Sequence, residues 1–187
     1  VLQAFPAVER VKCIPHASPD SWFAPGYTML VMVPDLRHRN AVDPLQPRVD
    51  LDTLERIRSH VLARGPMALD ASRLTVRNPR YRAVTADFRV AMRGGYAFSY
   101  YRRQINDALV RALSPWAFDA ERPLDFGGRV IRSALVDFVE SLEWVDYVTD
   151  FRLHFADTPA DDRPELAPDA PDTILVSAAG HLIDEVR

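Results

Sequence analysis

The sequence predicts an α+β domain in which three amphipathic helices pack on one face of a mixed or antiparallel sheet. The expected element order is β-α-β-β-α-α-β-β. Apolar and polar residues alternate along 84–93 and again along 147–155, as in strands with one buried face. A parallel strand covered on both faces would instead be a continuous apolar run. Three further segments carry apolar residues at helical spacing, and helices packed on one sheet face account for both patterns.

The first part of the chain is expected to hold a strand and a helix. Residues 1–25 contain four prolines and are predicted to be an irregular N-terminal segment. A strand over 27–33 follows it. The helix ends at Arg64, before Gly65-Pro66, and Asp50 or Asp52 can cap its first turn.

The middle of the chain contains the clearest signals. A short strand is predicted over 69–77, and the alternating strand 84–93 comes next. The pair Gly94-Gly95 then turns the chain into a helix over 98–113, which Pro115 ends.

A third helix is predicted from Gly128 to about Leu142, with apolar pairs at 130/131, 134/135 and 138/139. In the following strand, Tyr147 and Thr149 are expected on the same face as Phe151, Leu153 and Phe155. The predicted core unites the strands with this helix. It consists of Phe88, Val90, Phe138, Leu142, Phe151 and Leu153.

The end of the chain changes in composition. Residues 157–173 hold four prolines and many acids, which predicts an exposed loop, and 173–177 is a last apolar run, predicted as an edge strand. The predicted organisation therefore has four parts: an irregular segment 1–25, an α+β domain 26–156, an acidic Pro-rich loop 157–173, and a C-terminal strand and tail 174–187.

Composition excludes several classes of function. The 187 residues carry 23 basic and 26 acidic side chains, a net charge of −3, which gives no global reason to expect nucleic acid or an anionic membrane as partner. Apolar runs such as 29–33 are too short to cross a bilayer. Cys13 is the only cysteine, which excludes an internal disulfide and a multi-cysteine zinc site and suits a reducing compartment. Because the chain begins with Val1, it is expected to be a fragment or a processed product.

No catalytic, cofactor-binding or metal-binding residue is predicted. The spacing Cys13-x-x-His16 suits a metal, but no second Cys/His pair lies nearby in the sequence. The other histidines are scattered, and His154 is expected on the polar face of its strand. No nucleophile-elbow, P-loop or dinucleotide motif occurs.

Charge is strongly segregated along the sequence. Residues 73–103 hold eight arginines against one acid, and residues 137–172 hold eleven acids against two arginines. Either the two stretches neutralise each other within the domain, or they form opposite surfaces that dock other subunits. The candidate interface residues are Arg89, Arg93, Arg102, Arg103, Asp161, Asp162 and Glu165.

Turn residues and strand starts occur in a characteristic order along most of the chain. They are Phe5-Pro6-x-Val8-x-Arg10-Val11-Lys12-Cys13, Pro25-Gly26, Val33-Pro34-Asp35, Arg64-Gly65-Pro66, Leu74-Thr75-Val76-x-x-Pro79-x-Tyr81-x-x-Val84, Leu109-x-x-x-Leu113-x-Pro115, Asp125-Phe126-Gly127-Gly128 and Val145-x-Tyr147-Val148. This order resembles the C-terminal part of baseplate J-like proteins, which are baseplate wedge components of contractile phage tails and related injection systems.

The resemblance implies a structural role without catalysis. Proteins of that family build the wedge that connects the tail hub to the sheath, and they transmit the trigger for contraction. The implied partners are other wedge, hub and sheath proteins in a hetero-oligomeric ring, assembled in the cytoplasm and then carried in the particle. Neither nucleic acid nor direct membrane insertion is implied.

Two other functions remain open from the residues alone. A small α+β enzyme or ligand-binding module could use His154 and the carboxylates near it. An RNA-binding domain could use the arginine-rich strand face, although Tyr81 and Phe88 fall in an ordinary core pattern.

Overall fold

The computed structural model describes the chain except for residues 37–42, 67–68, 120–121, 123, 125 and 187. The chain forms two compact units, Val1–Arg80 and Tyr81–Arg187. This boundary falls inside the range 26–156 that the sequence predicted as one domain. The mixed α+β class with three helices is confirmed, and the predicted order is broadly kept among additional strands.

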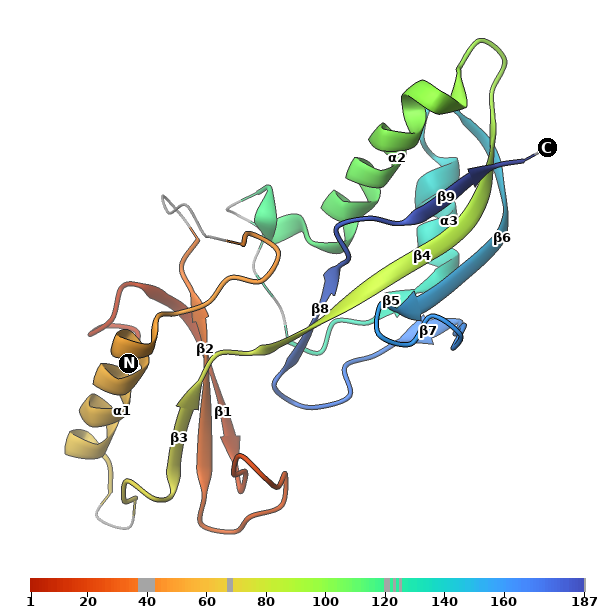
Figure 1. Cartoon of the computed structure of the whole chain (residues 1–187). Coiled ribbons are helices and arrows are strands. Elements are labelled where there is room, and N and C mark those ends of the chain that lie inside the picture. The colour runs from red at the N-terminus through yellow and green to blue at the C-terminus, as the bar shows by residue number, and fades with distance from the viewer. Residues whose placement is uncertain (37–42, 67–68, 120–121, 123, 125, 187) are drawn as a thin grey trace. The chain divides into compact units, whose positions relative to one another are not determined.

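The described residues of the N-terminal unit form a three-stranded sheet and one helix (Figure 1). The strands are β1 (Val8–Pro15), β2 (Thr28–Pro34) and β3 (Leu74–Arg77), in the order β1-β2-β3. β1 pairs antiparallel with β2, and β3 pairs parallel with it. The prediction of an irregular segment over 1–25 is therefore wrong for 8–15. The prolines lie at the end of this strand or outside it, where they do not interrupt its ladder.

Helix α1 (Leu51–Arg64) begins and ends as the sequence predicts. The Asp50 carboxylate caps it by accepting the Thr53 backbone N–H at 2.8 Å, which lowers the pKa of Asp50. Leu54 and Ile57 are buried with Leu30 and Met32 of β2 in one apolar cluster.

The C-terminal unit is built on a second sheet. Its strand order is β6 (Val145–Phe155), β4 (Arg80–Met92), β8 (Thr173–Ser177), and β9 (Leu182–Glu185) also pairs with β4. The pairing of β4 with β6 is antiparallel, and its pairing with β9 is parallel. The predicted edge strand over 173–177 is present, whereas β9 was not predicted.

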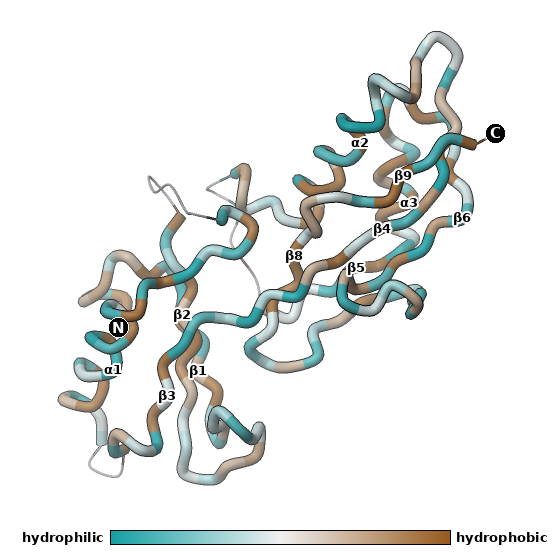
Figure 2. Tube along the Cα trace, viewed as in Figure 1, coloured by the Kyte–Doolittle hydropathy of each residue, from teal (hydrophilic) through white to brown (hydrophobic). Residues whose placement is uncertain are grey.

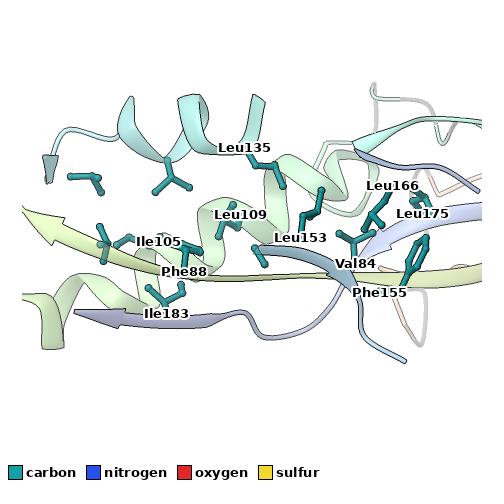
Figure 3. Packing of buried hydrophobic residues seen from close by; sticks show 14 residues of the cluster. Val84, Phe88, Ile105, Leu109, Leu135, Leu153, Phe155, Leu166, Leu175 and Ile183 are labelled. Carbon is teal, nitrogen blue, oxygen red and sulfur yellow. The ribbon is translucent and has the colours of Figure 1, made fainter. Parts of the chain in front are cut away.

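Two helices supply the other half of this unit's core. Helix α2 (Phe98–Leu113) has the predicted bounds, and hydrophobic and hydrophilic residues alternate along it (Figure 2). Its Ile105 and Leu109 join Leu135 of α3 (Arg132–Glu140) against Phe88 and other strand residues (Figure 3). Of the predicted core, Phe88, Val90 and Leu153 are buried, and Phe138, Leu142 and Phe151 are partly buried against the same cluster.

The predicted third helix and the predicted loop 157–173 are both partly wrong. Val130–Ile131 form a short strand, β5, and α3 begins only at Arg132. β5 pairs antiparallel with β7 (Glu165–Leu166), which lies inside the predicted loop. Leu166 is 1% exposed and joins the core. This buried side chain and the β5–β7 pairing hold the acidic segment against the unit.

A bulge interrupts the alternation of β6. Asp87 of β4 pairs with Arg152, and Arg89 pairs with Thr149, so Phe88 faces two residues of β6. One of them, Asp150, has a φ of 54°, in the left-handed region where aspartate is tolerated better than most residues.

The extra residue at the bulge shifts the inward and outward positions of β6 by one. Tyr147 pairs with Ala91 and is 45% exposed, whereas Val148 packs on the core. The prediction that Tyr147 and Thr149 share the face of Phe151 and Leu153 is therefore wrong. A further register shift follows between Ala91 and Met92.

β6 is the edge of its sheet, and two of its outward amides are capped by carboxylates. The Val148 N–H donates to Glu140 Oε1 at 3.0 Å, and the Leu153 N–H donates to Asp162 Oδ1 at 2.9 Å. The Leu153 carbonyl accepts the Arg163 N–H at 2.9 Å. Side chains and a loop therefore occupy bonding positions that an edge strand would otherwise present.

Candidate interaction surfaces

The arginines of the predicted interface lie on two elements of the C-terminal unit. Arg89 lies on the face of β4 opposite the core and forms an ion pair with Asp150 at 3.5 Å, both side chains being mostly exposed. Arg93 is exposed just beyond the end of β4, where its backbone N–H donates to the Trp144 carbonyl at 3.0 Å. These two arginines therefore differ, since Arg89 has an internal partner for its charge.

Arg102 and Arg103 lie on α2 away from its buried stripe, as predicted. Arg103 is 3.9 Å from Asp107 one turn along the helix, and its side chain is 91% exposed. Among the described residues, neither Arg93 nor Arg102 forms an ion pair. These two side chains are accordingly the part of the arginine-rich stretch most available to a partner.

The predicted acidic residues are all engaged within the unit. Asp161 pairs with Arg163 at 2.6 Å, Asp162 with Arg132 at 2.9 Å, and Glu165 with Arg129 at 2.7 Å. The hydrogen bond from Arg163 lowers the pKa of Asp161. The exposed pairs contribute little to stability, but they orient the loop on the body of the unit.

The arginine-rich and acidic stretches are paired with each other at two places within the unit. The two stretches meet at Arg82, which lies 3.2 Å from Asp157 and 3.2 Å from Asp169, and again where Arg89 meets Asp150. Partial neutralisation therefore occurs inside the unit. The exposed arginines at 93 and 102 have no such acidic partner among the described residues.

The histidines do not form a catalytic arrangement in the part of the chain that the structure describes. His154, predicted on a polar surface, is 3% exposed, and its Nδ1 lies 3.0 Å from the Phe155 carbonyl. The surface prediction for His154 is wrong because Thr85, its partner across the sheet, is also buried, so this end of β6 is covered on both faces.

Ser177 and His181 resemble a nucleophile and its base, but the protons are placed differently. His181 Nδ1 accepts the Ala86 N–H at 3.1 Å, so the neutral ring carries its proton on Nε2. Nε2 lies 3.1 Å from Ser177 Oγ and must donate to it, whereas a general base would accept. The Ser177 hydroxyl donates to the Ala178 carbonyl at 2.8 Å. This network holds the β8–β9 connection in place.

The metal-like spacing at Cys13 has no structural support in the described residues. Cys13 and His16 are exposed, and no group of three or more potential ligands among the described His, Cys, Asp and Glu residues is arranged to hold an ion.

Sequence reasoning missed an apolar hollow of about 400 Å³ in the C-terminal unit. It lies between the end of α2, the 3₁₀ turn η1 (Pro115–Ala117), β5 and α3. Residues at its wall include Leu113, Trp116, Ile131, Ala134 and Phe138. The sequence signal nearest to it, the apolar residues at 130, 131, 134 and 135, predicts a helix stripe instead.

Comparison with known proteins defines the class. Over residues 4–177, the sequence matches the family described as "Baseplate protein PVC11-like". The chain belongs to this family of baseplate proteins. The resemblance expected from the sequence, to baseplate J-like proteins, is supported at the coarser level of a baseplate protein of contractile injection systems.

A solved structure shares the fold. The chain resembles one in the cryo-EM structure of the anti-feeding prophage (AFP) baseplate, six-fold symmetrised, with a TM-score of 0.65 and 21% sequence identity. The match covers 94% of this chain and 35% of that chain, so the present chain spans about a third of its length. No protein of curated function matches the sequence.

Proposed function

We propose that this chain is a structural domain of a baseplate wedge in a contractile injection system and that it acts through protein–protein contacts. Family membership over residues 4–177 is the observation that carries the proposal. The outward arginines at 93 and 102 support it, because arginine is enriched at protein interfaces. The resemblance to baseplate J-like proteins adds the wedge position.

The proposed partners are other wedge, hub and sheath proteins in a hetero-oligomeric ring. Assembly takes place in the cytoplasm, and the domain then becomes part of the particle. No helix in the described part of the chain has the length and apolar character needed to cross a membrane.

The role is proposed to be non-enzymatic. Two observations support this over the enzyme alternative: the orientation of the Ser177–His181 pair opposes proton abstraction from serine, and His154 is enclosed within its sheet. A structural function depends instead on outward side chains such as Arg93 and Arg102.

The test is complementation of a strain that lacks the gene, with particles counted by negative-stain electron microscopy. The variant carries Arg93→Glu and Arg102→Glu, and the matched control carries Arg56→Glu and Arg64→Glu on α1. We expect the first pair to reduce the yield of complete particles at least about tenfold, as loss of charge complementarity at interfaces does.

High salt should lower the yield of complete particles more for the wild-type protein than for the variant. Salt screens charge contacts, and the variant has already lost them. Complete, contractile particles in the strain lacking the gene would refute the proposal. Equal yields from the two double variants would show that Arg93 and Arg102 are not interface residues, without contradicting the baseplate role.

A further inference from the structure

Four aromatic side chains gather where the turn between β4 and α2 meets the start of β6, at one end of the C-terminal unit (Figure 1). Tyr101 of α2 lies at the centre of this group. Its ring is stacked on Trp144 with centres 5.2 Å apart, and it meets Tyr96 and Tyr100 edge to face at 5.2 and 4.9 Å. Tyr100 is 67% exposed, so the group presents a large aromatic side chain to solvent. Tyrosine and tryptophan are enriched at protein interfaces and among their hot spots.

Backbone hydrogen bonds hold this aromatic group in place. The Tyr96 N–H donates to the Arg93 carbonyl at 3.1 Å and closes a β-turn, in which Gly95 has a φ of 97°. Glycine adopts this left-handed conformation without steric cost. The Arg93 N–H donates to the Trp144 carbonyl at 3.0 Å, which ties the turn to the start of β6. Few torsions are left to be ordered when a partner binds, so the entropic cost of binding is low.

A positive charge without an ion-pair partner lies beside the aromatic group. Arg93 is exposed, and no carboxylate among the described residues pairs with it. The carboxylate of Glu143 is already engaged, because the Tyr96 hydroxyl donates to it at 3.2 Å. This hydrogen bond raises the pKa of Tyr96, and the charge of Arg93 opposes the rise, so the guanidinium group lies within electrostatic reach of that ring. A carboxylate supplied by a partner would complete the pairing that Arg93 lacks.

We propose that this aromatic group and Arg93 form a docking surface, the Tyr100 surface, for an acidic residue of another protein of the particle. The carboxylate of that residue pairs with Arg93, and an apolar side chain beside it packs on the exposed ring of Tyr100. This inference rests on the proposed function, since it takes the partner from the same assembly, and it adds the chemistry by which the partner is recognised.

A protein partner fits the Tyr100 surface better than a nucleic acid does. Proteins that bind single strands use a row of open aromatic faces along a basic groove. Here the rings of Tyr96 and Tyr100 stand at 77° and 79° to the ring of Tyr101. Trp144 is stacked on Tyr101, so the faces form no continuous row. The Glu143 carboxylate within the group would also repel phosphates. A guanidinium group beside an engaged carboxylate matches one acidic side chain and not a polyanion.

The first experiment is a competition for incorporation. Cells co-express wild-type protein with Tyr100→Ser or Arg93→Glu, and mass spectrometry compares the variant-to-wild-type ratio in purified particles with the ratio in the lysate. We expect each variant to be depleted about tenfold or more, as loss of an interface hot spot implies. Incorporation of both variants at the wild-type ratio would overturn the proposal.

The matched controls are Arg111→Glu and Phe118→Ser, at and beyond the other end of α2. Phe118 is 52% exposed, and the Arg111 Cζ atom lies 5.0 Å from its ring centre, so an arginine and an open aromatic ring are again adjacent. Both ratios should stay near one, and depletion as strong as that of Tyr100→Ser would contradict a specific Tyr100 surface. Thermal unfolding of each variant excludes misfolding. If Tyr100→Ser unfolds at a lower temperature, Arg93→Glu, whose side chain is exposed, decides the same question.

The second experiment identifies the partner. A photo-reactive benzoylphenylalanine replaces Tyr100, and assembled particles are irradiated and digested. The expected adduct joins position 100 to a peptide of another particle protein, with an acidic residue beside the attachment point. The proposal is wrong if the adduct joins a second copy of this chain, if no acidic residue lies beside the attachment point, or if particles that contain the protein give no adduct.

A charge swap then tests the ion pair itself. The acidic residue beside the attachment point is replaced by arginine in the partner, and the competition is repeated. This partner should favour Arg93→Glu over the wild-type protein, because the two charges are exchanged, and it should still reject Tyr100→Ser. An unchanged preference for the wild-type protein would show that the carboxylate does not pair with Arg93, against the proposal.

A labelled single-stranded oligonucleotide tests the remaining partner class. Binding by fluorescence anisotropy that is lost in both Tyr100→Ser and Arg93→Glu would assign the surface to nucleic acid and overturn the proposal. Absence of the wild-type protein from particles is a different result: it would refute the proposed baseplate function itself, and this inference with it.

Discussion

β4 and β6 lie side by side in one sheet, but their side chains follow different rules. β4 keeps its core positions at every second residue from Val84 to Val90. β6 loses that repeat at Asp150, where the bulge turns Tyr147 outward and Val148 inward. The difference teaches that alternation in the sequence predicts which face is buried only while the register between strands is unbroken.

The largest expected effect comes from comparing β4 and β6 at the two phenylalanines through which they are in contact. The rings of Phe88 and Phe151 are stacked with centres 4.9 Å apart, but Phe88 is 1% exposed and Phe151 is only partly buried. Phe88→Ala should lower the free energy of unfolding by about 3–5 kcal/mol, because it leaves a closed cavity, and Phe151→Ala by about 1–3 kcal/mol. Urea denaturation measures both.

Tyr147→Ala is the decisive companion to these two variants. The bulge leaves Tyr147 45% exposed, so its truncation should cost about 0.5 kcal/mol or less. If Tyr147→Ala costs as much as Phe151→Ala, the two residues share a face, and the register shift in β6 is wrong.

The second effect concerns His181, which lies between β8 and β9 and accepts a hydrogen bond from the backbone of β4. Burial lowers the pKa of His181 from 6.5 to about 4, and its neutral ring accepts the Ala86 N–H. As pH falls through 6.5, the unfolded chain binds this proton before the folded chain does. The free energy of unfolding should therefore fall between pH 6.5 and about 4, by up to about 3 kcal/mol, and this contribution is complete above pH 6.5.

Thermal denaturation across this pH range measures the effect, with His181→Gln as the reference. The glutamine offers an acceptor without a titrating proton, so the wild-type protein should lose its advantage over the variant as pH falls. Parallel curves for the two proteins would assign the pH dependence to other groups.

A third effect tests the bulge at its backbone. Because Asp150 has a φ of 54°, Asp150→Gly should be more stable than Asp150→Ala by about 1 kcal/mol. In a regular strand the order is reversed, since glycine loses more conformational entropy than alanine does. Both variants remove the carboxylate, so the sign of their difference in chemical denaturation reports the backbone alone.

The smallest effect is the side-chain link between the strands. Arg89 and Asp150 are 3.5 Å apart, and both side chains are more than half exposed. A double-mutant cycle with alanine at each position should give a coupling of about 0.3 kcal/mol at low salt. The coupling should vanish near 1 M salt, where the Debye length is about 3 Å. A coupling that persists there would mean that the pair is shielded from solvent.

Much of the fold was predictable where the determining signal is local. Helix α2 has its expected bounds because an apolar stripe, the Gly94-Gly95 turn and Pro115 all lie within or beside it. α1 was equally predictable, since Asp50 and Gly65 mark its ends.

The elements that were missed depend on partners far away in the chain. β5 at 130–131 is a strand only because 165–166 pairs with it, and in isolation its two apolar residues continue the stripe of α3. β1 is defined by pairing with β2 across the loop 16–27, although its own sequence carries no clear alternation. Sequence pattern cannot supply such a partner.

The candidate surfaces show the same division. Alternation and helical spacing correctly place Arg89, Arg93, Arg102 and Arg103 outside the core. They do not reveal which of these charges are paired, because Asp150 reaches Arg89 through the bulge. The sequence gives no signal that the Phe23 side chain is 83% exposed, since an aromatic residue in a Pro-rich loop is as readily buried as exposed.

The capped edge of β6 has a consequence for how copies of this chain meet one another. An uncapped edge strand can template β-pairing with the next copy, and repeated pairing of that kind grows into open-ended fibres. At Val148 and Leu153, the carboxylates of Glu140 and Asp162 occupy the amides that such a neighbour would need. At these two positions β6 therefore cannot pair with a strand of another copy, and any association is left to side-chain surfaces.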